Sequence, residues 1–466
     1  MSVHGRVEPP AEAADGRDPA GELRALAGDC VHCGFCLPAC PTYQLWGEEM
    51  DSPRGRIHLM TQVLDGTELN ESTAGHLDRC LGCMACVPAC PSGVRYDRLI
   101  ESARTWVEDA RARPGHSPGP DEDEYHRTLR ERAVRAAIFA VFPHPRRLRL
   151  LTGPLRAAQR TGLDKVVRRS SLPGRLPPEL EAALRLAPPP AGRVPRLPRR
   201  VAARGPRRAV VGMLTGCVQG VFFPQVNTAT ARVLAAEGCD VVIPNGQGCC
   251  GALSLHSGRR SQALQLARHT IATFEAAGVD AIVVNSAGCG SAMKEYGQLL
   301  ADDPAWAARA EELARRVRDF AEFLAELASP PAATRHPLPV TAVYHDACHL
   351  GYAQGIRAQP RALLRAIPGL ELSETGDGGT CCGSAGVYNL LQPEAAAELG
   401  RRKAATIRAT GARLLISANP GCSLQIATAL AEQGLSMPVA HTAQVLDASI
   451  RGLPVSRLTG RTPAAG

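Results

Sequence analysis

Two runs of cysteines carry the plainest chemistry in the sequence. Both follow the pattern C-x2-C-x2-C-x3-C-P, from Cys30 to Pro41 and from Cys80 to Pro91. In this spacing a short loop aims three thiolates at three irons of one cube, and the fourth cysteine ligates the other cluster. The sequence therefore predicts two [4Fe–4S] clusters with crossed ligand sets. The first set is Cys30, Cys33, Cys36 and Cys90, and the second is Cys80, Cys83, Cys86 and Cys40.

The competing interpretation of these runs is a pair of zinc sites with four cysteines each. Zinc sites usually take two C-x2-C pairs from separate loops and do not need a closing Cys-Pro. Two complete copies of the longer pattern therefore favour iron–sulfur clusters. The module is similar to the two-cluster ferredoxins. The long, helix-rich insert between Cys40 and Cys80 predicts a helical form of that domain.

A second group of cysteines forms an internal repeat, since each member of the first half recurs 131 to 133 residues later. The two sets are Cys217, Cys249, Cys250 and Cys289, and then Cys348, Cys381, Cys382 and Cys422. The outer cysteines of each set lie just past a predicted strand. Open parallel sheets bind ligands at the carboxyl ends of their strands. We expect the loops there to bring the four thiols of each half together as candidate metal ligands.

Alternating strands and helices surround this repeat. The predicted strands are 209–214, 240–243, 281–284, 340–344, one near Glu371, and 414–417. The predicted helices are 227–236, 262–277, 305–327, one that follows Pro360, and 393–410. The alternation predicts parallel sheets with helices on their faces. The expected fold class is α plus α/β, with a helical two-cluster domain followed by two repeated α/β cysteine-rich domains.

Composition divides the chain into segments. The expected segments are a disordered tail (1–20), the two-cluster domain (21–110), a basic helical and Pro-rich linker (111–208), two cysteine-rich domains (209–330 and 335–450) and a tail (451–466). Within the linker, residues 123–170 predict helices that carry many arginines. They form either a bridge packed on the cluster domain or an amphipathic helix at a membrane surface.

Charge and hydropathy restrict the classes of function. The 466 residues carry a net charge of +8 and 17 cysteines. No apolar run is long enough for a transmembrane helix, and the first residues predict no signal peptide. Cysteines held as reduced metal ligands indicate the cytoplasm, and the basic charge also fits peripheral attachment to the inner face of the cell membrane. With 4% aromatic residues and no nucleic-acid motif, a nucleic-acid partner is not expected.

The repeat resembles the cysteine-rich "CCG" domain of heterodisulfide reductases, glycerol-3-phosphate dehydrogenase electron-transfer subunits and glycolate oxidase. The family pattern ends each half in C-x-x-C, whereas Ala292 and Gln425 stand at those last positions here. A four-cysteine iron–sulfur cluster, a zinc site and a vestigial half are the open alternatives. His345 and His349 flank Cys348, and either supply or tune a ligand or simply pack.

The order of the modules resembles the iron–sulfur subunits of glycolate oxidase. Besides the first cysteine run, the carrying segments are Asp51-Ser-Pro-Arg-Gly-Arg-Ile, His76-Leu-Asp-Arg-Cys-Leu-Gly-Cys, Cys90-Pro-Ser-Gly-Val-Arg-Tyr, Asn285-Ser-Ala-Gly-Cys-Gly and Tyr344-His-Asp-Ala-Cys-His-Leu. Arg54 and Arg56 in the first of these either pack on the cluster domain, meet a flavoprotein or form surface salt bridges. Cys239 fits neither half and is expected to be a buried free thiol.

The resemblance implies an electron relay without catalytic residues of its own. Separate FAD subunits would oxidise a 2-hydroxy acid, glycolate to glyoxylate, and the electrons would pass through this chain toward a membrane quinone. The sequence agrees, since no G-x-G-x-x-G follows a predicted strand. Alternatives within the class are subunits that serve lactate, glycerol 3-phosphate or a heterodisulfide. The alternative from another class is a non-enzymatic zinc-binding protein.

Overall fold

The computed structural model describes residues 19–112, 128–163, 176–188, 194–327 and 331–460. Most of the tail expected at 1–20, parts of the linker and residues 461–466 lie outside the described residues. The chain divides into two compact units. One contains residues 1–139 and 253–263, and the other contains 140–252 and 264–466.

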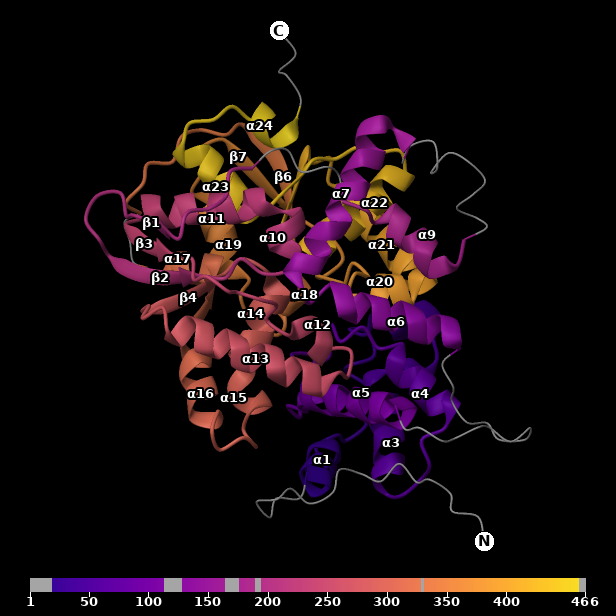
Figure 1. The fold of residues 1–466 in the computed structure, drawn as a ribbon. Helices are drawn as coiled ribbons and strands as arrows, with labels where there is room; N and C mark the ends of the chain where they lie inside the picture. The colour runs from indigo at the N-terminus through magenta and orange to yellow at the C-terminus, as the bar shows by residue number, and fades with distance from the viewer. Residues whose placement is uncertain (1–18, 113–127, 164–175, 189–193, 328–330, 461–466) are drawn as a thin grey trace. The chain divides into compact units, whose positions relative to one another are not determined.

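The first unit is helical, and its cysteine runs lie in loops between helices (Figure 1). Its elements are α1 (Pro19–Gly28), α2 (Pro41–Trp46), the 3-10 helix η1 (Glu49–Asp51), α3 (Pro53–Leu64), α4 (Glu71–Asp78) and α5 (Tyr96–Ala112). Side-chain caps fix the helix starts, because Ser52 accepts a hydrogen bond from the Gly55 N–H and Asn70 accepts one from the Thr73 N–H. The first cysteine run begins just after α1 and ends at Pro41, the first residue of α2. The second run begins just after α4 and ends shortly before α5.

The second unit contains two sheets whose neighbouring strands are parallel, except for the antiparallel pair β1–β3. The first sheet has the order β1 (Arg200–Val201), β3 (Cys239–Val242), β2 (Ala209–Met213), β4 (Ala281–Val284) and β5 (Val317–Asp319). The second has the order β7 (Leu370–Glu374), β6 (Val340–His345), β8 (Leu414–Ser417) and β9 (Val439–Ala440). The expected α plus α/β fold class is confirmed.

Helices cover these sheets and join them in one core. Those of the first half are α10 (Val218–Phe222), α11 (Pro224–Ala236), α14 (Ala287–Lys294), α15 (Tyr296–Leu299), α16 (Ala307–Arg316) and α17 (Phe320–Glu326). Those of the second half are α18 (Cys348–Gly351), α19 (Ala358–Arg365), α20 (Tyr388–Leu391), α21 (Pro393–Ala409), α22 (Pro420–Glu432), α23 (Thr442–Ile450) and α24 (Ser456–Thr459). Helix α11 packs against α23, and one buried cluster contains Val211 of β2 together with Ile416 of β8.

Two further helices of this unit, α7 (Pro145–Thr161) and α9 (Pro178–Arg185), come from the linker. Helix α6 (Leu129–Val141), also from the linker, and α12 (Ala252–Leu255) and α13 (Arg260–Glu275) each cross the division between the two units. The break between α6 and α7 falls at Pro143-His144-Pro145, because a proline cannot continue a helix but starts one well. Arg135 of α6 forms an ion pair with Glu108 of α5.

The single helix predicted over 305–327 is wrong, because strand β5 interrupts it. Val317 to Asp319 pair in parallel with Ile282 to Val284 of β4. The Asp319 carboxylate then caps α17, and the Glu322 carboxylate accepts a hydrogen bond from the Asp319 N–H. This capping box starts a new helix where the apolar pattern reads as continuous. The short strands β1, inside the predicted linker, and β9 were also missed, because two residues show no periodicity.

The turn at Gly383 holds the second Cys-Cys-Gly segment against α21. Its φ of +87° is in the left-handed region, and an added Cβ would lie 2.7 Å from the Ala396 carbonyl oxygen. Gly251, at the same place in the first half, has a φ of +88°. Glycine therefore allows the cysteine pair to approach the backbone of the following helix.

We expect Gly383→Ala to lower stability by about 2–4 kcal/mol, since it adds backbone contact to the strain of a left-handed alanine. Gly411→Ala is the matched control, because Gly411 has a φ of +65° but no atom within 4 Å of an added Cβ. It should cost only about 1–2 kcal/mol. Thermal unfolding followed by circular dichroism compares the two variants. Equal losses would contradict the close approach at Gly383.

Candidate iron–sulfur and metal sites

The crossed ligand sets divide the eight cysteines of the first unit by burial. Cys40, Cys80, Cys83 and Cys86 are all buried, whereas Cys30, Cys36 and Cys90 are half-buried and Cys33 is exposed. One predicted cluster would thus be held among buried thiols and the other near the surface. Thiolates are the donor groups that four-iron clusters take, so both sets fit that group.

The two runs share an unusual backbone. His32 and Gly82 occupy the same place in their runs and have φ values of +53° and +62°. Gly34 and Met84 also correspond, with φ values of +85° and +61°. Non-glycine residues seldom adopt this left-handed conformation, and it concentrates at functional sites. The repeated conformation lets each loop curl around one point, as ligation of a cluster requires.

Cys80 lies among groups that favour a thiolate. Its Sγ accepts a hydrogen bond from the Gly82 N–H at 3.3 Å and one from the Tyr96 hydroxyl at 3.6 Å. Burial by itself raises the pKa of a thiol. The charges of Arg56 and Arg104 outweigh that effect with the help of these hydrogen bonds, so the pKa of Cys80 is lowered. This cysteine is prepared to bind metal, because the thiolate is the ligand form.

Cys86 shows which thiols gather around the second run. Its pKa is raised well above the usual value, first by burial and then by the neighbouring thiols of Cys83, Cys80 and Cys40. Cys40 and Cys36, both from the first run, also act on Cys86, so the two runs lie near each other.

An ion network centred on the fully buried pair Arg56 and Asp51 lies beside this set. The Asp51 carboxylate accepts hydrogen bonds from Arg56 at 3.1 Å and from Arg79 at 2.7 Å, and it lies 3.0 Å from His76 Nδ1. Arg56 also donates to the Thr42 hydroxyl at 3.1 Å. The guanidinium is therefore held by several acceptors while its charge acts on Cys80 and Cys40.

Arg54 and Arg56, indistinguishable in the sequence, have different surroundings. Arg56 is fully buried and packs inside the cluster domain. Arg54 is partly exposed and pairs with Glu49 at 2.6 Å, and it also donates to the carbonyl of His32 in the first run. Of these two arginines, Arg56 is the one whose charge acts on the buried thiols of the second ligand set.

In the second unit, the first half of the repeat forms a chain of thiols. The Cys217 thiol donates to Cys249 Sγ at 3.5 Å, Cys250 also contacts Cys249, and Cys289 contacts Cys250. Hydrogen bonds from Cys217 and Cys250 lower the pKa of Cys249, whereas those two thiols have raised pKa values. The four predicted residues are thus brought together beyond the carboxyl ends of β2, β3 and β4.

The second half repeats this arrangement. Cys348 contacts Cys381, which contacts Cys382, which contacts Cys422. Cys422 Sγ accepts a hydrogen bond from the side-chain amide of Asn419 at 3.4 Å. Contact with Cys381 and then burial raise the pKa of Cys348. Contact with Cys381 lowers the pKa of Cys382, but contact with Cys422 and burial outweigh it, so this pKa is raised as well.

The two histidines of this half differ in position. His349 Nδ1 lies 3.5 Å from Cys348 Sγ. The ligand atoms of His345, Cys382 and Cys422 all lie within 4.8 Å of one another. Burial lowers the pKa of His345 to about 3, so the imidazole is neutral, which is the form that binds metals.

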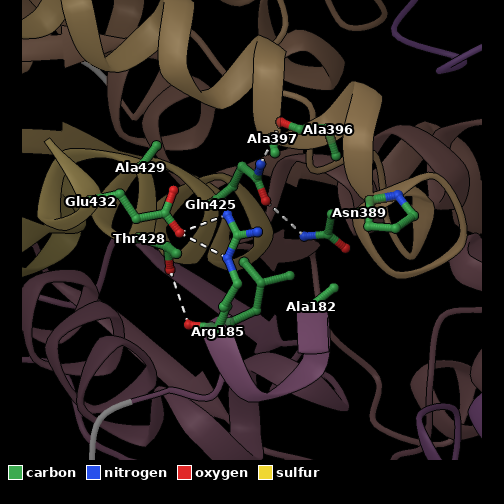
Figure 2. A pocket seen from close by; sticks show the side chains of 11 residues that line it. Ala182, Arg185, Asn389, Ala396, Ala397, Gln425, Thr428, Ala429 and Glu432 are labelled. Carbon is green, nitrogen blue, oxygen red and sulfur yellow. Dashed lines mark hydrogen bonds and ion pairs between the residues drawn. The ribbon is translucent and has the colours of Figure 1, made fainter. Parts of the chain in front are cut away.

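Ala292 and Gln425 stand at the two positions where the family has its final cysteine, and both make other contacts. Ala292 is buried on α14. Figure 2 shows Gln425 accepting a hydrogen bond from Asn389 at 3.1 Å and donating to the carbonyl of Ala396 at 2.8 Å. It lines a small pocket beside Arg185 of α9. Gln425 is therefore occupied by protein partners, and each half offers four cysteines.

Sequence reasoning missed several residues around these thiols. Tyr96 and Arg104 act on Cys80, and Asp51 fixes Arg56. Tyr96 is the last residue of one of the segments that carry the family resemblance, so the sequence did contain a sign that it belongs to the site. Nothing local marks Arg104. Cys239 lies in β3 away from both thiol chains, and burial raises its pKa to about 12.

Comparison with protein families assigns these parts. The model "4Fe-4S dicluster domain" matches residues 27–94, and "Cysteine-rich domain" (CCG) matches 211–294 and 342–427. The model "Glycolate oxidase iron-sulfur subunit, linker region" matches 130–187. The chain is thus an iron–sulfur protein with a dicluster domain followed by two cysteine-rich domains, and the prediction of iron–sulfur clusters is confirmed.

Curated relatives show to which kind of iron–sulfur protein the chain is similar. The chain is 39% identical to "Probable glycolate oxidase iron-sulfur subunit" of Bacillus subtilis, over 90% of this chain and 93% of that protein. It is 37% identical to "Glycolate oxidase iron-sulfur subunit" of Escherichia coli, over 87% and 92% respectively. "Lactate utilization protein A" of Shouchella clausii is 35% identical over 51% of this chain and 98% of that protein.

The chain belongs to the family of glycolate oxidase iron–sulfur subunits, as its sequence predicted. It is an electron-transfer component of an oxidoreductase, and such a subunit works in a complex with other subunits. In the described part of the chain, no helix combines the length and the apolar character needed to cross a bilayer.

We expect Arg56→Met to destabilise the protein by about 3–5 kcal/mol, because it leaves the buried Asp51 carboxylate without one of its partners. Arg54→Met is the matched control two residues away, and the loss of its partly exposed ion pair should cost about 0–1 kcal/mol. Thermal unfolding of both variants measures the difference. Similar shifts for the two variants would contradict the role given to the buried network.

Proposed function

We propose that this chain carries electrons from FAD-containing subunits, which oxidise glycolate to glyoxylate, toward a membrane quinone. The observation that carries the proposal is the division of the eight cysteines into a buried and an accessible set. A relay between proteins needs one centre close to a surface, where a partner can reach it, and the accessible set meets this need. The printed names of the two relatives that span most of this chain support glycolate as the substrate.

The proposed ligands are those that the crossed pattern predicts. Cys30, Cys33, Cys36 and Cys90 hold the accessible cluster, and Cys80, Cys83, Cys86 and Cys40 hold the buried one. When bound, these clusters accept and pass single electrons. The chain's own residues fix the thiolates, exclude water from the buried set, and place Arg56 and the Tyr96 hydroxyl beside Cys80. Both groups stabilise added negative charge there.

Two exposed apolar side chains support our placement of the flavin-bearing partner. Val31 and Phe35 are 68% and 67% exposed, and they flank the exposed Cys33 in the first run. Large apolar side chains next to a functional group indicate a protein contact. We place the FAD subunit over these two side chains. Removal of hydride from the substrate then takes place in that subunit, and no substrate site is proposed in this chain.

Lactate is the second candidate substrate, because "Lactate utilization protein A" is similar over half of this chain. Glycerol 3-phosphate and a heterodisulfide are alternatives from relatives of the cysteine-rich domain. The residues of this chain do not contact the substrate in the proposed arrangement. The flavin subunits that co-purify with it therefore decide between these substrates.

The test uses the complex co-purified anaerobically from its native cells. We expect glycolate, and not lactate or glycerol 3-phosphate, to reduce both the flavin and an added quinone analogue. Cys86→Ser should leave flavin reduction by glycolate intact and bring quinone reduction down to the rate without this subunit. Flavin and quinone reduction are followed by their absorbance changes.

Cys239→Ser is the control for that variant, since Cys239 is a buried cysteine outside all the proposed ligand sets. It should leave both reactions unchanged. If lactate or glycerol 3-phosphate alone reduced the flavin and the quinone analogue, the assignment of glycolate as the substrate would be overturned. Unchanged quinone reduction in Cys86→Ser would overturn the relay.

We further propose that the chain attaches peripherally to the inner face of the membrane through α7. Leu150 and Leu151 on this helix are 77% and 54% exposed, and Arg146, Arg147 and Arg149 beside them are exposed as well. Leu148 is buried instead, and α7 contacts α10 of the same unit. Exposed leucines among arginines fit the boundary between acyl chains and anionic headgroups.

The double variant Leu150→Glu with Leu151→Glu should lose binding to vesicles that contain anionic lipid, because it places two carboxylates in that boundary. A flotation assay with the full chain measures this. Leu180→Glu is the matched control, since Leu180 is an exposed leucine on α9. If the double variant floats as the unmodified chain does, α7 is only a bridge between domains.

A further inference from the structure

Three potential ligand atoms meet at the carboxyl ends of three adjacent strands in the second sheet. His345 is the last residue of β6, Cys382 follows β7, and Cys422 lies near the start of the helix after β8. The sheet order β7-β6-β8 brings them together, with His345 beside Ser417 in register. Their ligand atoms lie within 4.8 Å of one another.

The imidazole of His345 has no hydrogen-bond partner among the described residues. The residue is 1% exposed, and neither ring nitrogen has a hydrogen bond in the structure. A buried polar group without a partner costs about 1–3 kcal/mol. Most buried polar atoms are satisfied, so an exception needs an explanation. Here both nitrogens are free while one of them faces two thiols, which indicates that a bound ion completes the site.

The spacing fits one ion better than a cube of iron and sulfur. With Zn–S at about 2.3 Å and Zn–N at about 2.0–2.1 Å, a tetrahedral ion holds its ligand atoms roughly 3.4–3.8 Å apart. Ligands of a cube bind different irons and stand farther apart. In the residues that the structure describes, the eight cysteines of the cluster domain contain no such close group of three, whereas the second half of the repeat does.

The first half of the repeat does not offer this donor set. Leu214 stands three residues before Cys217, where His345 stands three residues before Cys348. Leucine cannot bind a metal, so the two halves of the repeat differ in chemistry although they share a fold. A mixed set of imidazole and thiolates in a closed, buried site is typical of structural zinc.

We propose that the second cysteine-rich domain binds one zinc ion through His345, Cys382 and Cys422, and that Cys381, whose thiol lies outside this close group, moves in as the fourth ligand when the ion binds. Cys381 is the next thiol along the chain of contacts, since it touches Cys382. Zinc carries no electrons, so this half has a structural role and electrons do not pass through it. The inference goes beyond the relay proposed above and does not depend on it.

The test measures zinc and iron in the full chain, purified anaerobically. We expect one zinc per chain in the unmodified protein. His345→Leu, which installs the residue of the first half, should lower the zinc content by about tenfold or more, because loss of a ligand costs at least as much as loss of an outer partner. Iron content and the electron paramagnetic resonance spectrum should not change.

Two further variants separate loss of the ligand from loss of the fold. His345→Cys should keep the zinc, because a thiolate replaces the imidazole in a four-cysteine site. His349→Leu should keep it too, since His349 lies beside Cys348 and outside the proposed ligands. Cobalt substituted for zinc should show the absorption of a tetrahedral thiolate site in the unmodified chain and in His349→Leu, and should lose it in His345→Leu.

The inference is overturned if the unmodified chain contains no zinc, or if His345→Leu keeps its zinc. It is also overturned if His345→Cys and His345→Leu lose zinc equally while their circular dichroism matches the unmodified chain. A failure of the electron relay would leave the zinc content unaffected, so the two proposals fail separately.

Discussion

A thiolate buried away from water needs a positive charge beside it, and this requirement shapes the parts of the molecule that carry chemistry. In the cluster domain Arg56 supplies that charge to Cys80 and Cys40. The guanidinium is itself buried, so Asp51 must balance it. Asp51 also forms an ion pair with Arg79. These ion pairs hold the start of α3 and the end of α4 beside one ligand set.

The cysteine-rich repeat meets the same requirement differently. Its thiols lie at the carboxyl ends of parallel strands, where each half forms a chain of contacts. The main side-chain influences on these thiols come from other thiols and from His144 and His349, so a bound metal would supply the charge that Arg56 supplies in the cluster domain. The halves then diverge at single positions. His345 adds an imidazole to one of them where Leu214 stands in the other, and Gln425 has replaced a ligand by contacts with the protein.

Much of this could be predicted from the sequence, because spacing along the chain determines it. The two cysteine runs, the repeat and the strands before each cysteine are local patterns. Strand β5 was not predictable, because Val317 continues a helical pattern and only its pairing with β4 makes it a strand. Arg54 and Arg56 look alike in the sequence, and burial separates them only when α3 packs. The unpaired nitrogens of His345 likewise depend on contacts between distant segments.

The central claim is that the paired cysteine runs hold two four-iron clusters, one buried and one accessible. Its most direct test is electron paramagnetic resonance of the anaerobically purified, reduced chain, together with iron and acid-labile sulfide analysis. The account predicts about eight irons and eight sulfides in these runs and two spin-coupled clusters. A water-soluble paramagnetic agent should change the relaxation of only one cluster. A preparation without iron, or one in which both clusters respond equally, would contradict the account.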